Sequence, residues 1–253
     1  MYQRQRKILD ILQKGKLLIR ETAEVLGVTE MTLRRDLKSL EERKLILMVK
    51  GGAILHPARY EPENDGQTDS SADYKFAIAN ALYERIMPAD SLFISAGSTS
   101  LAFAKVIARR NHLPVTVITN SLPVASTLFR SSCKVILLGG ELRTHSLDLV
   151  GPIAEKNLEE YQVDWLISGC DAALSDYGFY TSDVSVSNLE KKSLQIASKA
   201  AIITVSSKFG RRALTRFATL SDIDLLITDE ALPENEQKNL KKSGLELILT
   251  VTA

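Results

Sequence analysis

The sequence predicts an α/β protein that has a small helical N-terminal domain and a larger C-terminal domain built on a mostly parallel sheet. The first part of the chain repeats its apolar residues at helical spacing, whereas short aliphatic strands alternate with helical segments from Asp73 onward. Near-continuous apolar strands of this kind are typical of parallel sheets that are covered on both faces. The segment between the two patterns is rich in Pro, Gly, Asp, Glu and Ser, so we expect domains at 1–56 and 73–253 with a linker at 57–72.

The composition is that of an ordinary globular protein with one basic end. The chain has 253 residues, of which 45% are hydrophobic and 25% are charged, and this length can bury a sizeable core. The formal net charge is +1, but residues 1–50 hold 12 Lys and Arg against 7 Asp and Glu, while the rest of the chain holds 20 against 24. A basic N-terminal part on a mildly acidic body indicates that this part meets nucleic acid.

The N-terminal sequence and the cysteines indicate a cytoplasmic protein. The opening residues MYQRQRK are not followed by an apolar run long enough for a signal peptide or a membrane span. Cys133 and Cys170 are isolated, each in or beside an expected buried strand, and we expect both to be reduced core thiols. Because the three His residues are scattered and no Cys pair is present, the sequence predicts neither a metal site nor a cofactor.

The stretch VTEMTLRRDLKSL is typical of an amphipathic helix with a basic face. Thr29 has the side chain of a good N-cap, and Glu30 in the first turn suits the positive end of the helix dipole. Leu33, Leu37 and Leu40 recur at spacings of four and three residues and therefore share one buried stripe. The side chains on the other face can hold phosphates and reach base edges. They are Met31, Thr32, Arg34, Arg35 and Lys38.

The surroundings of this helix predict a winged helix-turn-helix. A shorter helical pattern runs from Ile19 to Leu26 and is broken by Gly27, and strand-forming residues around the turn Gly51–Gly52 follow the basic helix. A short helix, a tight turn and a longer basic helix form the helix-turn-helix pattern, whose second helix enters the major groove. An ordinary amphipathic helix with a solvated charged face is the alternative. The flanking helix and the expected β-wing favour DNA binding, and a first helix is expected over residues 2–14.

The segment RQRKILDIL…ETAEVLGVTEMTLRRDLKSLEERKLI…KGGAI resembles the winged helix-turn-helix of the DeoR family of bacterial transcription regulators. The matching residues include Arg6, Ile8, Ala23, Val28, Thr32, Arg34, Arg35, Asp36, Leu37, Leu40, Gly51 and Gly52. The resemblance implies double-stranded operator DNA as a partner. The expected DNA contacts are Arg20, Thr22, Thr29, Met31, Thr32, Arg34, Arg35, Lys38 and, in the wing, Lys50. Most operators read in this way have two-fold symmetry, so we expect a homodimer or a higher oligomer.

In the second part of the chain, strands and helices are expected to alternate. The expected strands are SLFIS, VTVIT, KVILL, VDWLISG, AAIITV, DLLIT and LELILTV. The expected helices span Tyr74 to Ile86, Leu101 to Arg109, Pro123 to Phe129, Ile153 to Glu160, Asn188 to Lys199 and Pro233 to Lys242. Because ligands of open parallel sheets bind outside the carboxyl ends of the strands, the loops that follow strands supply the candidate binding residues.

Four of these loops carry groups that suit a small anion. The loop Ala96–Ser100 precedes a helix whose N-terminus attracts negative charge, and Asn120–Ser121 again lies at a helix start. The loop Gly139–Arg143 adds a guanidinium, and Ser206–Gly210 adds the ammonium of Lys208. Each loop taken alone is more often a plain turn, cap or surface segment. Four such loops at the same end of one sheet predict a pocket for a small anionic ligand, and we expect this ligand to be a phosphorylated metabolite.

The motifs AGSTS, ITNS, GGELR, SGCDA and SSKFG, between about Lys75 and Gly210, are similar to the effector domain of the same family. That domain is similar in fold to ribose-phosphate isomerases, and such regulators usually respond to phosphorylated sugars or their derivatives. The loops and the resemblance together give one set of expected effector contacts. They are Gly97, Ser98, Thr99, Ser100, Asn120, Ser121, Gly139, Gly140, Arg143, Gly169, Asp171, Lys191 and Lys208.

The sequence also departs from the family pattern at the expected effector site. Ser95 and Val205 stand where many members have Asp. Val186 and the pair Glu190–Lys191 stand in place of the usual Glu and Lys-Arg pair, so one cation of two remains. The resemblance therefore implies an effector with less negative charge, or with a different hydroxyl geometry, than the commonest one.

The leading hypothesis is a transcriptional regulator, most simply a repressor of carbohydrate-catabolism genes, whose operator affinity is modulated by a phosphorylated sugar or a related metabolite. The alternative is a sugar-phosphate isomerase-like enzyme that carries a DNA-binding domain. Its general base would be Glu141, Asp148, Asp171 or Asp176, and its electrophile Lys208. The absence of Asp at positions 95 and 205 argues against catalysis, so we expect no enzymatic activity. A third possibility, a second domain that serves only assembly, is disfavoured by the polar loops.

Overall fold

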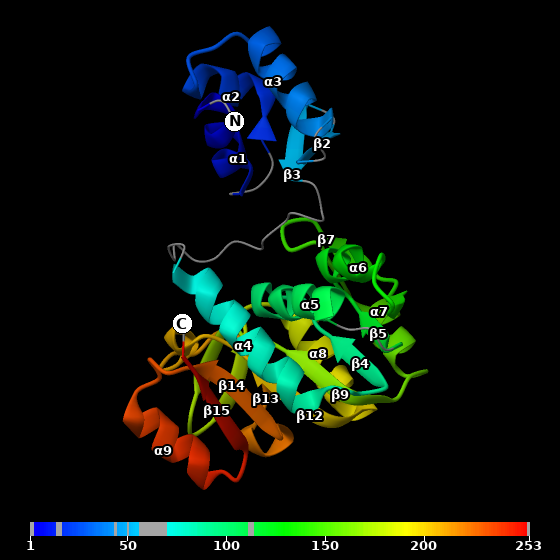
Figure 1. The fold of residues 1–253 in the computed structure, drawn as a ribbon, viewed down its shortest axis with the longest axis vertical. Helices are drawn as coiled ribbons and strands as arrows, with labels where there is room; N and C mark the ends of the chain where they lie inside the picture. Colours follow the sequence, from blue (N-terminus) through cyan, green and yellow to red (C-terminus); the bar gives the residue numbers. More distant parts are fainter. Residues whose placement is uncertain are drawn as a thin grey trace. The chain divides into compact units, whose positions relative to one another are not determined.

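The computed structural model describes residues 3–13, 17–42, 45–49, 51–55, 70–110 and 114–251. The chain divides into two compact units, Met1–Gly66 and Gln67–Ala253 (Figure 1). Each unit has its own apolar core, and we describe them in turn.

The N-terminal unit consists of three helices and a small antiparallel sheet. Its elements are α1 (Gln3–Gln13), β1 (Leu17–Leu18), α2 (Ile19–Val25), α3 (Glu30–Glu42), β2 (Ile46–Val49) and β3 (Gly52–Leu55). The strands lie in the order β1-β3-β2, so β2 and β3 form the predicted wing. Strand β1, which pairs with β3, was not predicted. Leu33, Leu37 and Leu40 are fully buried against Ile8 and Leu12 of α1, as the helical spacing predicted.

The turn between α2 and α3 is fixed by backbone hydrogen bonds. The N–H of Gly27 donates to Glu24 O at 3.1 Å, and the N–H of Val28 donates to Ala23 O at 3.0 Å. This pattern is a Schellman motif, in which the residue at the position of Gly27 takes a positive φ, here 64°. The Thr29 hydroxyl accepts from the N–H of Thr32 at 3.2 Å, which confirms Thr29 as the N-cap of α3.

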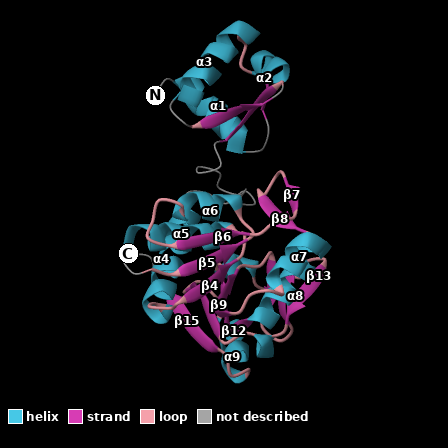
Figure 2. Ribbon diagram, turned by 90° about the vertical axis from the view of Figure 1, so that its right-hand side faces the viewer, coloured by secondary structure: helices cyan, strands magenta, loops and turns pink. Residues whose placement is uncertain are grey.

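The C-terminal unit is an α/β domain built on a seven-stranded parallel sheet (Figures 1 and 2). The strands of this sheet are β4 (Ser91–Ile94), β5 (Thr116–Thr119), β6 (Lys134–Leu137), β9 (Val163–Ser168), β12 (Ala197–Ile203), β14 (Leu225–Asp229) and β15 (Glu246–Thr250). The helices are α4 (Ser70–Ile86), α5 (Ser98–Arg110), α6 (Leu122–Leu128), α7 (Pro152–Leu158), α8 (Val184–Ile196) and α9 (Glu234–Lys242). All seven expected strands and six expected helices are present.

Helices cover both faces of the sheet, as the apolar strands predicted. Leu92 and Ile94 of β4 pack in one cluster with α4, α5 and α6. Phe93, between them, points to the opposite face and packs in a second cluster with α7, α8 and α9. This alternation along a strand that is buried on both sides explains why its residues are almost all apolar. Cys133 and Cys170 are half-buried and pack against these two clusters.

Several short strands were not predicted. They form a hairpin of β7 (Glu141–Arg143) and β8 (Asp148–Val150) and a second sheet of β10 (Ala172–Leu174), β11 (Gly178–Thr181) and β13 (Thr215–Ala218). Two single turns of 3-10 helix, η2 (Ser206–Lys208) and η3 (Leu220–Asp222), complete the unit. The prediction of helix up to Lys199 was wrong, because α8 ends at Ile196 and β12 begins at the next residue.

The strand order places a topological switch point between β4 and β9. The order is β15-β14-β12-β9-β4-β5-β6. From β4 the chain therefore builds the sheet outward through β5 and β6, returns to β9, and then builds in the other direction. In open α/β sheets, ligands bind at the carboxyl ends of the strands that flank such a point. Here those ends are Ser95, after β4, and Ser168–Gly169, at the end of β9.

Candidate nucleic-acid interface and effector site

One face of α3 is exposed and basic. Arg34, Arg35 and Lys38 are exposed, whereas the leucine stripe on the opposite face is fully buried. Met31 lies on the same exposed face by helical spacing and is 80% exposed. The structure therefore confirms the division of α3 into a buried apolar face and an exposed basic face.

The first turn of α3 is held by local side-chain contacts. The hydroxyls of Thr29 and Thr32 lie 2.9 Å apart and share a hydrogen bond. Arg34 Nη2 lies 3.8 Å from Glu30 Oε2, an i,i+4 ion pair between exposed side chains. Further along, Arg4 of α1 donates from Nη2 to Asp36 Oδ1 at 3.2 Å, which fixes α1 against α3. The cations of the exposed face are thus presented on a well-anchored helix.

The remaining expected DNA contacts fall into three cases. Arg20 on α2 is exposed and forms a loose ion pair with Glu24 at 4.0 Å. Thr22 is only 5% exposed because α2 packs this side of the helix into the core. The structure therefore does not support the expected contact between its side chain and DNA. Lys50 lies outside the described residues.

At the switch point, the first loop is fixed by neighbouring strands. The N–H of Ser95 donates to Ile167 O of β9 at 2.9 Å, and the N–H of Ala96 donates to Asn120 Oδ1 at 3.1 Å. The Asn120 amide in turn donates to Leu149 O in the β7–β8 hairpin at 3.2 Å. Asn120 thereby joins the ends of β4 and β5 to the hairpin, while Ser121 caps α6 by accepting from the N–H of Val124 at 3.3 Å.

The loop after β4 leads directly into α5, which begins at Ser98. The first turn of α5 also contains Thr99, which is 8% exposed, and Ser100, which is fully buried. The hydroxyl of Ser100 has no hydrogen-bond partner within the described part of the chain. A buried hydroxyl without a partner is costly, and this one lies at a helix N-terminus beside the switch point, where an anion would be stabilised.

Glu190 of α8 was not expected in the site as a binding residue, yet it lies beneath the first loop. It is 5% exposed, and its carboxylate accepts from the hydroxyls of Ser95 and Ser193. Burial raises the pKa of this carboxyl to about 7. The two departures noted at Ser95 and Glu190 are therefore in contact. Sequence reasoning found each one separately but could not pair them, because they are far apart in the chain.

Arg143 is not a free guanidinium. It donates to both carboxylate oxygens of Asp148, at 3.1 and 2.8 Å, and Asp148 is completely buried. Its Nη1 also donates to Asp183 Oδ2 at 3.2 Å, and Asp183 caps α8 by accepting from the N–H groups of Ser185 and Val186. Arg143 therefore already bridges the β7–β8 hairpin and α8, and an incoming anion would compete with Asp183.

Gly139 and Gly140 serve the packing of the hairpin. The N–H of Gly139 donates to Asn157 Oδ1 of α7 at 3.1 Å. A Cβ atom at Gly140 would lie 2.7 Å from Val150 O and 3.0 Å from the Cβ of Ala154. The contacts at Gly140 explain that glycine without a ligand.

The loops after β9 and β12 lie alongside each other. The N–H of Gly210 donates to Ala173 O at 3.0 Å, which brings the loop that contains Lys208 next to the segment that follows Gly169. Asp171 is exposed, but it accepts from the Thr181 hydroxyl at 3.1 Å and from the N–H of Ser182 at 2.7 Å. Asp229, which was not predicted, is 3% exposed and accepts from the N–H of Ser206 at 2.7 Å.

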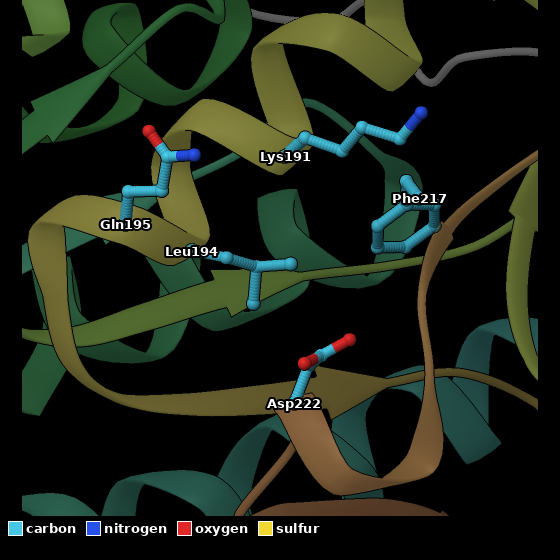
Figure 3. A pocket seen from close by; sticks show the side chains of 5 residues that line it. All are labelled: Lys191, Leu194, Gln195, Phe217 and Asp222. Carbon is cyan, nitrogen blue, oxygen red and sulfur yellow. The ribbon is translucent and has the colours of Figure 1, made fainter.

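Lys191 lies apart from these groups. It is exposed on α8 and lines a hollow of about 530 Å³ together with Leu194 and Gln195 of α8, Phe217 of β13 and Asp222 of η3 (Figure 3). None of the other expected effector contacts lines this hollow. Although Lys191 follows Glu190 in sequence, the Lys191 side chain lines this hollow, whereas the Glu190 side chain contacts Ser95.

Two further observations limit the chemistry of the described residues. They contain no group of three or more His, Cys, Asp and Glu side chains arranged to hold a metal ion. Among the same residues, no helix combines the length and the apolar character needed to cross a membrane.

A basic recognition helix in a winged fold, together with an α/β domain that gathers polar loops at a switch point, defines a DNA-binding regulator with a sensor domain. Residues 4–57 match the DeoR-like helix-turn-helix domain, and residues 70–230 match the DeoR C terminal sensor domain. The chain belongs to the DeoR family of transcriptional regulators. It therefore binds DNA through the N-terminal unit and a small effector through the sensor domain.

The chain matches several proteins that are named as transcriptional regulators, and each match covers almost the whole length of both chains. The chain is 33% identical to an HTH-type transcriptional regulator of Haemophilus influenzae, over 98% of this chain and 96% of the relative. It is 29% identical to a putative aga operon transcriptional repressor of Escherichia coli O157:H7, over 97% and 92% of the two chains. It is 28% identical to the glycerol-3-phosphate regulon repressor of Escherichia coli K12, over 98% of both. These homologues are regulators and not enzymes.

Two solved structures that match the chain are a ribose 5-phosphate isomerase and a translation initiation factor. Ribose 5-phosphate isomerase A of Methanocaldococcus jannaschii matches 56% of this chain and 55% of its own, with a TM-score of 0.41 and 16% identity. The translation initiation factor eIF-2B of Pyrococcus horikoshii matches 85% and 83% of the two chains, with a TM-score of 0.44 and 13% identity.

Two of the four carboxylates considered for isomerase chemistry are engaged in structural contacts. Asp148 is buried under the guanidinium of Arg143, and Asp171 accepts from Thr181 and Ser182. These contacts give both side chains a structural role in the sensor domain.

Proposed function

We propose that the protein is a repressor of carbohydrate-catabolism genes whose affinity for operator DNA is modulated by a phosphorylated sugar or a related metabolite. The observation that carries the ligand class is the buried hydroxyl of Ser100 in the first turn of α5, which has no hydrogen-bond partner among the residues that the structure describes. A phosphate oxygen that accepts from this hydroxyl and from the free N–H groups of the helix start would complete the hydrogen bonding there. Two relatives are named as repressors of an aga operon and of a glycerol-3-phosphate regulon, which supports a carbohydrate-linked role.

For the DNA half, we propose that α3 enters the major groove of a two-fold symmetric operator. Its contacts are Thr29, Met31, Thr32, Arg34, Arg35 and Lys38, with Arg20 of α2 at the DNA backbone. The exposed cations support this assignment because phosphate neutralisation dominates affinity for duplex DNA. A homodimer or higher oligomer in the cytoplasm fits a two-fold operator.

For the effector half, we propose that the ligand binds at the carboxyl ends of β4, β5 and β9. Gly97, Ser98, Thr99 and Ser100 hold its phosphate, while Asn120, Ser121, Gly169, Asp171 and Lys208 surround the remainder. Arg143 joins the site when the ligand displaces Asp183. Lys191, Gly139 and Gly140 are left out of this proposal because their contacts lie elsewhere.

The test is a ligand screen on the full chain. Phosphorylated pentoses, phosphorylated hexoses and glycerol 3-phosphate are each compared with the matching unphosphorylated compound, and the unfolding temperature is recorded. We expect one phosphorylated compound, but not its unphosphorylated counterpart, to raise that temperature, because a ligand that binds only the folded state stabilises it. The same compound should change the affinity for an operator obtained by selection from random DNA. If no phosphorylated compound does either, the effector half of the proposal is wrong and the DNA half stands.

A further inference from the structure

Met31 is an exposed apolar side chain on a helix whose other apolar residues are buried. It is 80% exposed, whereas Leu33, Leu37 and Leu40 are fully buried. The structure describes all thirteen residues of α3, and Met31 is the single large apolar residue that this helix leaves exposed. The packing of the N-terminal unit therefore gives no reason for a methionine at this position.

The polar side chains around Met31 are engaged with one another, and Met31 is the exposed large apolar side chain of the first turn. The hydroxyls of Thr29 and Thr32 are bonded to each other at 2.9 Å, and Thr29 also caps the helix. Arg34 pairs with Glu30 one turn further on. Helical spacing places Met31 on the same face as Arg34 and Arg35, so a duplex held by these cations also faces the thioether.

The chemistry of the major groove offers a partner for such a side chain. The N-terminal residues of a recognition helix reach the base edges, and thymine presents there the C5-methyl group, an apolar feature that cytosine and the purines lack. An unbranched thioether is flexible and polarisable, and it adapts well to a small apolar partner.

We propose that Met31 is a base-reading residue that packs against the C5-methyl group of thymine, so that the operator carries a thymine at one fixed position of each half-site. This inference rests on the proposed function only in that α3 must enter the major groove. It goes further because it assigns one side chain to one chemical group of one base.

The test removes that methyl group without changing base pairing. The operator is obtained by in vitro selection with the full wild-type chain, and each thymine is then replaced by uracil, one position at a time. For the wild type we expect uracil at one position of each half-site to weaken binding roughly 3- to 10-fold, the scale of one buried methyl contact in each half-site. For Met31→Ala we expect uracil and thymine at that position to bind equally, while the effects of all other substitutions remain.

Val25→Ala is the matched control. Val25 is likewise an exposed apolar residue, 77% exposed, but it is the last residue of α2 and lies outside the recognition helix whose N-terminal residues reach the base edges. We expect Val25→Ala to keep the wild-type response to uracil. Both truncated side chains are exposed, so circular dichroism should show wild-type folding for both variants.

Two results would overturn the inference, and they can be told apart. If Met31→Ala retains the wild-type response to uracil, Met31 does not read thymine, and the proposed DNA contact of α3 is unaffected. If Arg34→Ala and Arg35→Ala also bind the operator as the wild type does, α3 does not face DNA, and the inference fails together with the proposed function.

Discussion

Arg143 and Asp183 join the β7–β8 hairpin to the first turn of α8, with 3.2 Å between Arg143 Nη1 and Asp183 Oδ2. The side chain of Asp183 is 39% exposed. The side chain of Asp148, the other carboxylate that pairs with Arg143, is completely buried. Arg143 is therefore firmly held by one carboxylate and more loosely by the other. We expect a ligand phosphate that reaches this guanidinium to compete with Asp183, which is the looser partner.

Asp183→Asn should strengthen the binding of a phosphorylated effector by about two- to fivefold, because it removes the competing charge of a partly exposed pair. Asparagine is as good an N-cap as aspartate, so α8 should remain as stable as before. Asp183→Ala is the control, since it removes the same charge and also the cap, at a cost of about 1 kcal/mol in the free energy of unfolding. Calorimetric titration of both variants checks the prediction. Weaker effector binding by Asp183→Asn would show that Asp183 does not compete.

Ser100→Ala should weaken effector binding by about tenfold, the scale of one hydrogen bond to a charged group. The free energy of unfolding without ligand should be unchanged or slightly higher, because the Ser100 hydroxyl has no partner in the described part of the protein. Ser193→Ala is the matched control: Ser193 is equally buried, but it donates to Glu190 O at 2.8 Å. That variant should lose stability and keep its ligand affinity. Equal ligand affinity of Ser100→Ala and wild type would place the phosphate elsewhere.

Glu190 should make the stability of the sensor domain depend on pH. Burial raises the pKa of its carboxyl from 4.5 to about 7. Between these values the folded state holds a proton that the unfolded chain has released, so stability falls as pH rises through this range. Glu190→Gln removes the titration and keeps a neutral group of similar shape. At pH 8 the variant should be more stable than the wild type, by on the order of 2–3 kcal/mol, and at pH 5 the two should differ little.

Urea unfolding of both proteins at the two pH values measures this difference directly. An equal difference between wild type and Glu190→Gln at pH 5 and pH 8 would mean that Glu190 titrates alike in the folded and unfolded states. The hydrogen bond from Ser95 would then balance the effect of burial on the pKa of the carboxyl.

Gly52→Ala should disrupt the wing, because a Cβ atom at this position would lie 1.8 Å from Leu17 O in the neighbouring strand β1. Such overpacking costs about 1–3 kcal/mol or more and should weaken both the N-terminal unit and DNA binding. Gly51→Ala is the control: it meets no atom within 4 Å, but its φ is 81°, so it should cost only about 1 kcal/mol. Faster amide hydrogen exchange in β1 and β3 of Gly52→Ala alone would agree with this account; equal exchange in both variants would contradict it.

Periodicity was enough to predict the N-terminal unit and the layers of the sensor domain. The leucine stripe of α3 and the apolar strands each follow from one repeated spacing. The sequence did not predict β1, since two residues carry no period, nor the end of α8, since no Gly or Pro separates Ile196 from β12. The hairpin of β7 and β8 was missed because its three-residue strands mix polar and apolar side chains.

The effector site could be predicted only in part, because strand order is a tertiary property. The loops after β4 and β5 were expected from the parallel sheet. The switch point that brings β4 beside β9 was not, and Glu190 enters the site from a helix about a hundred residues away. The expected ligand contacts of Gly139 and Gly140 stay predictions, since glycine in a loop fits close packing and ligand binding equally well.

The salt dependence of DNA binding tests the central claim most directly. Binding of the full chain to its selected operator is measured by fluorescence anisotropy over a range of NaCl concentrations, for wild type and for Arg34→Ala with Arg35→Ala. We predict that the slope of log K against log salt becomes shallower by about 0.9 for each DNA phosphate that the protein no longer neutralises, so by about 1–2 for each protomer of the double variant that is bound to the operator. A double variant with the wild-type slope and affinity would show that the basic face of α3 does not hold DNA.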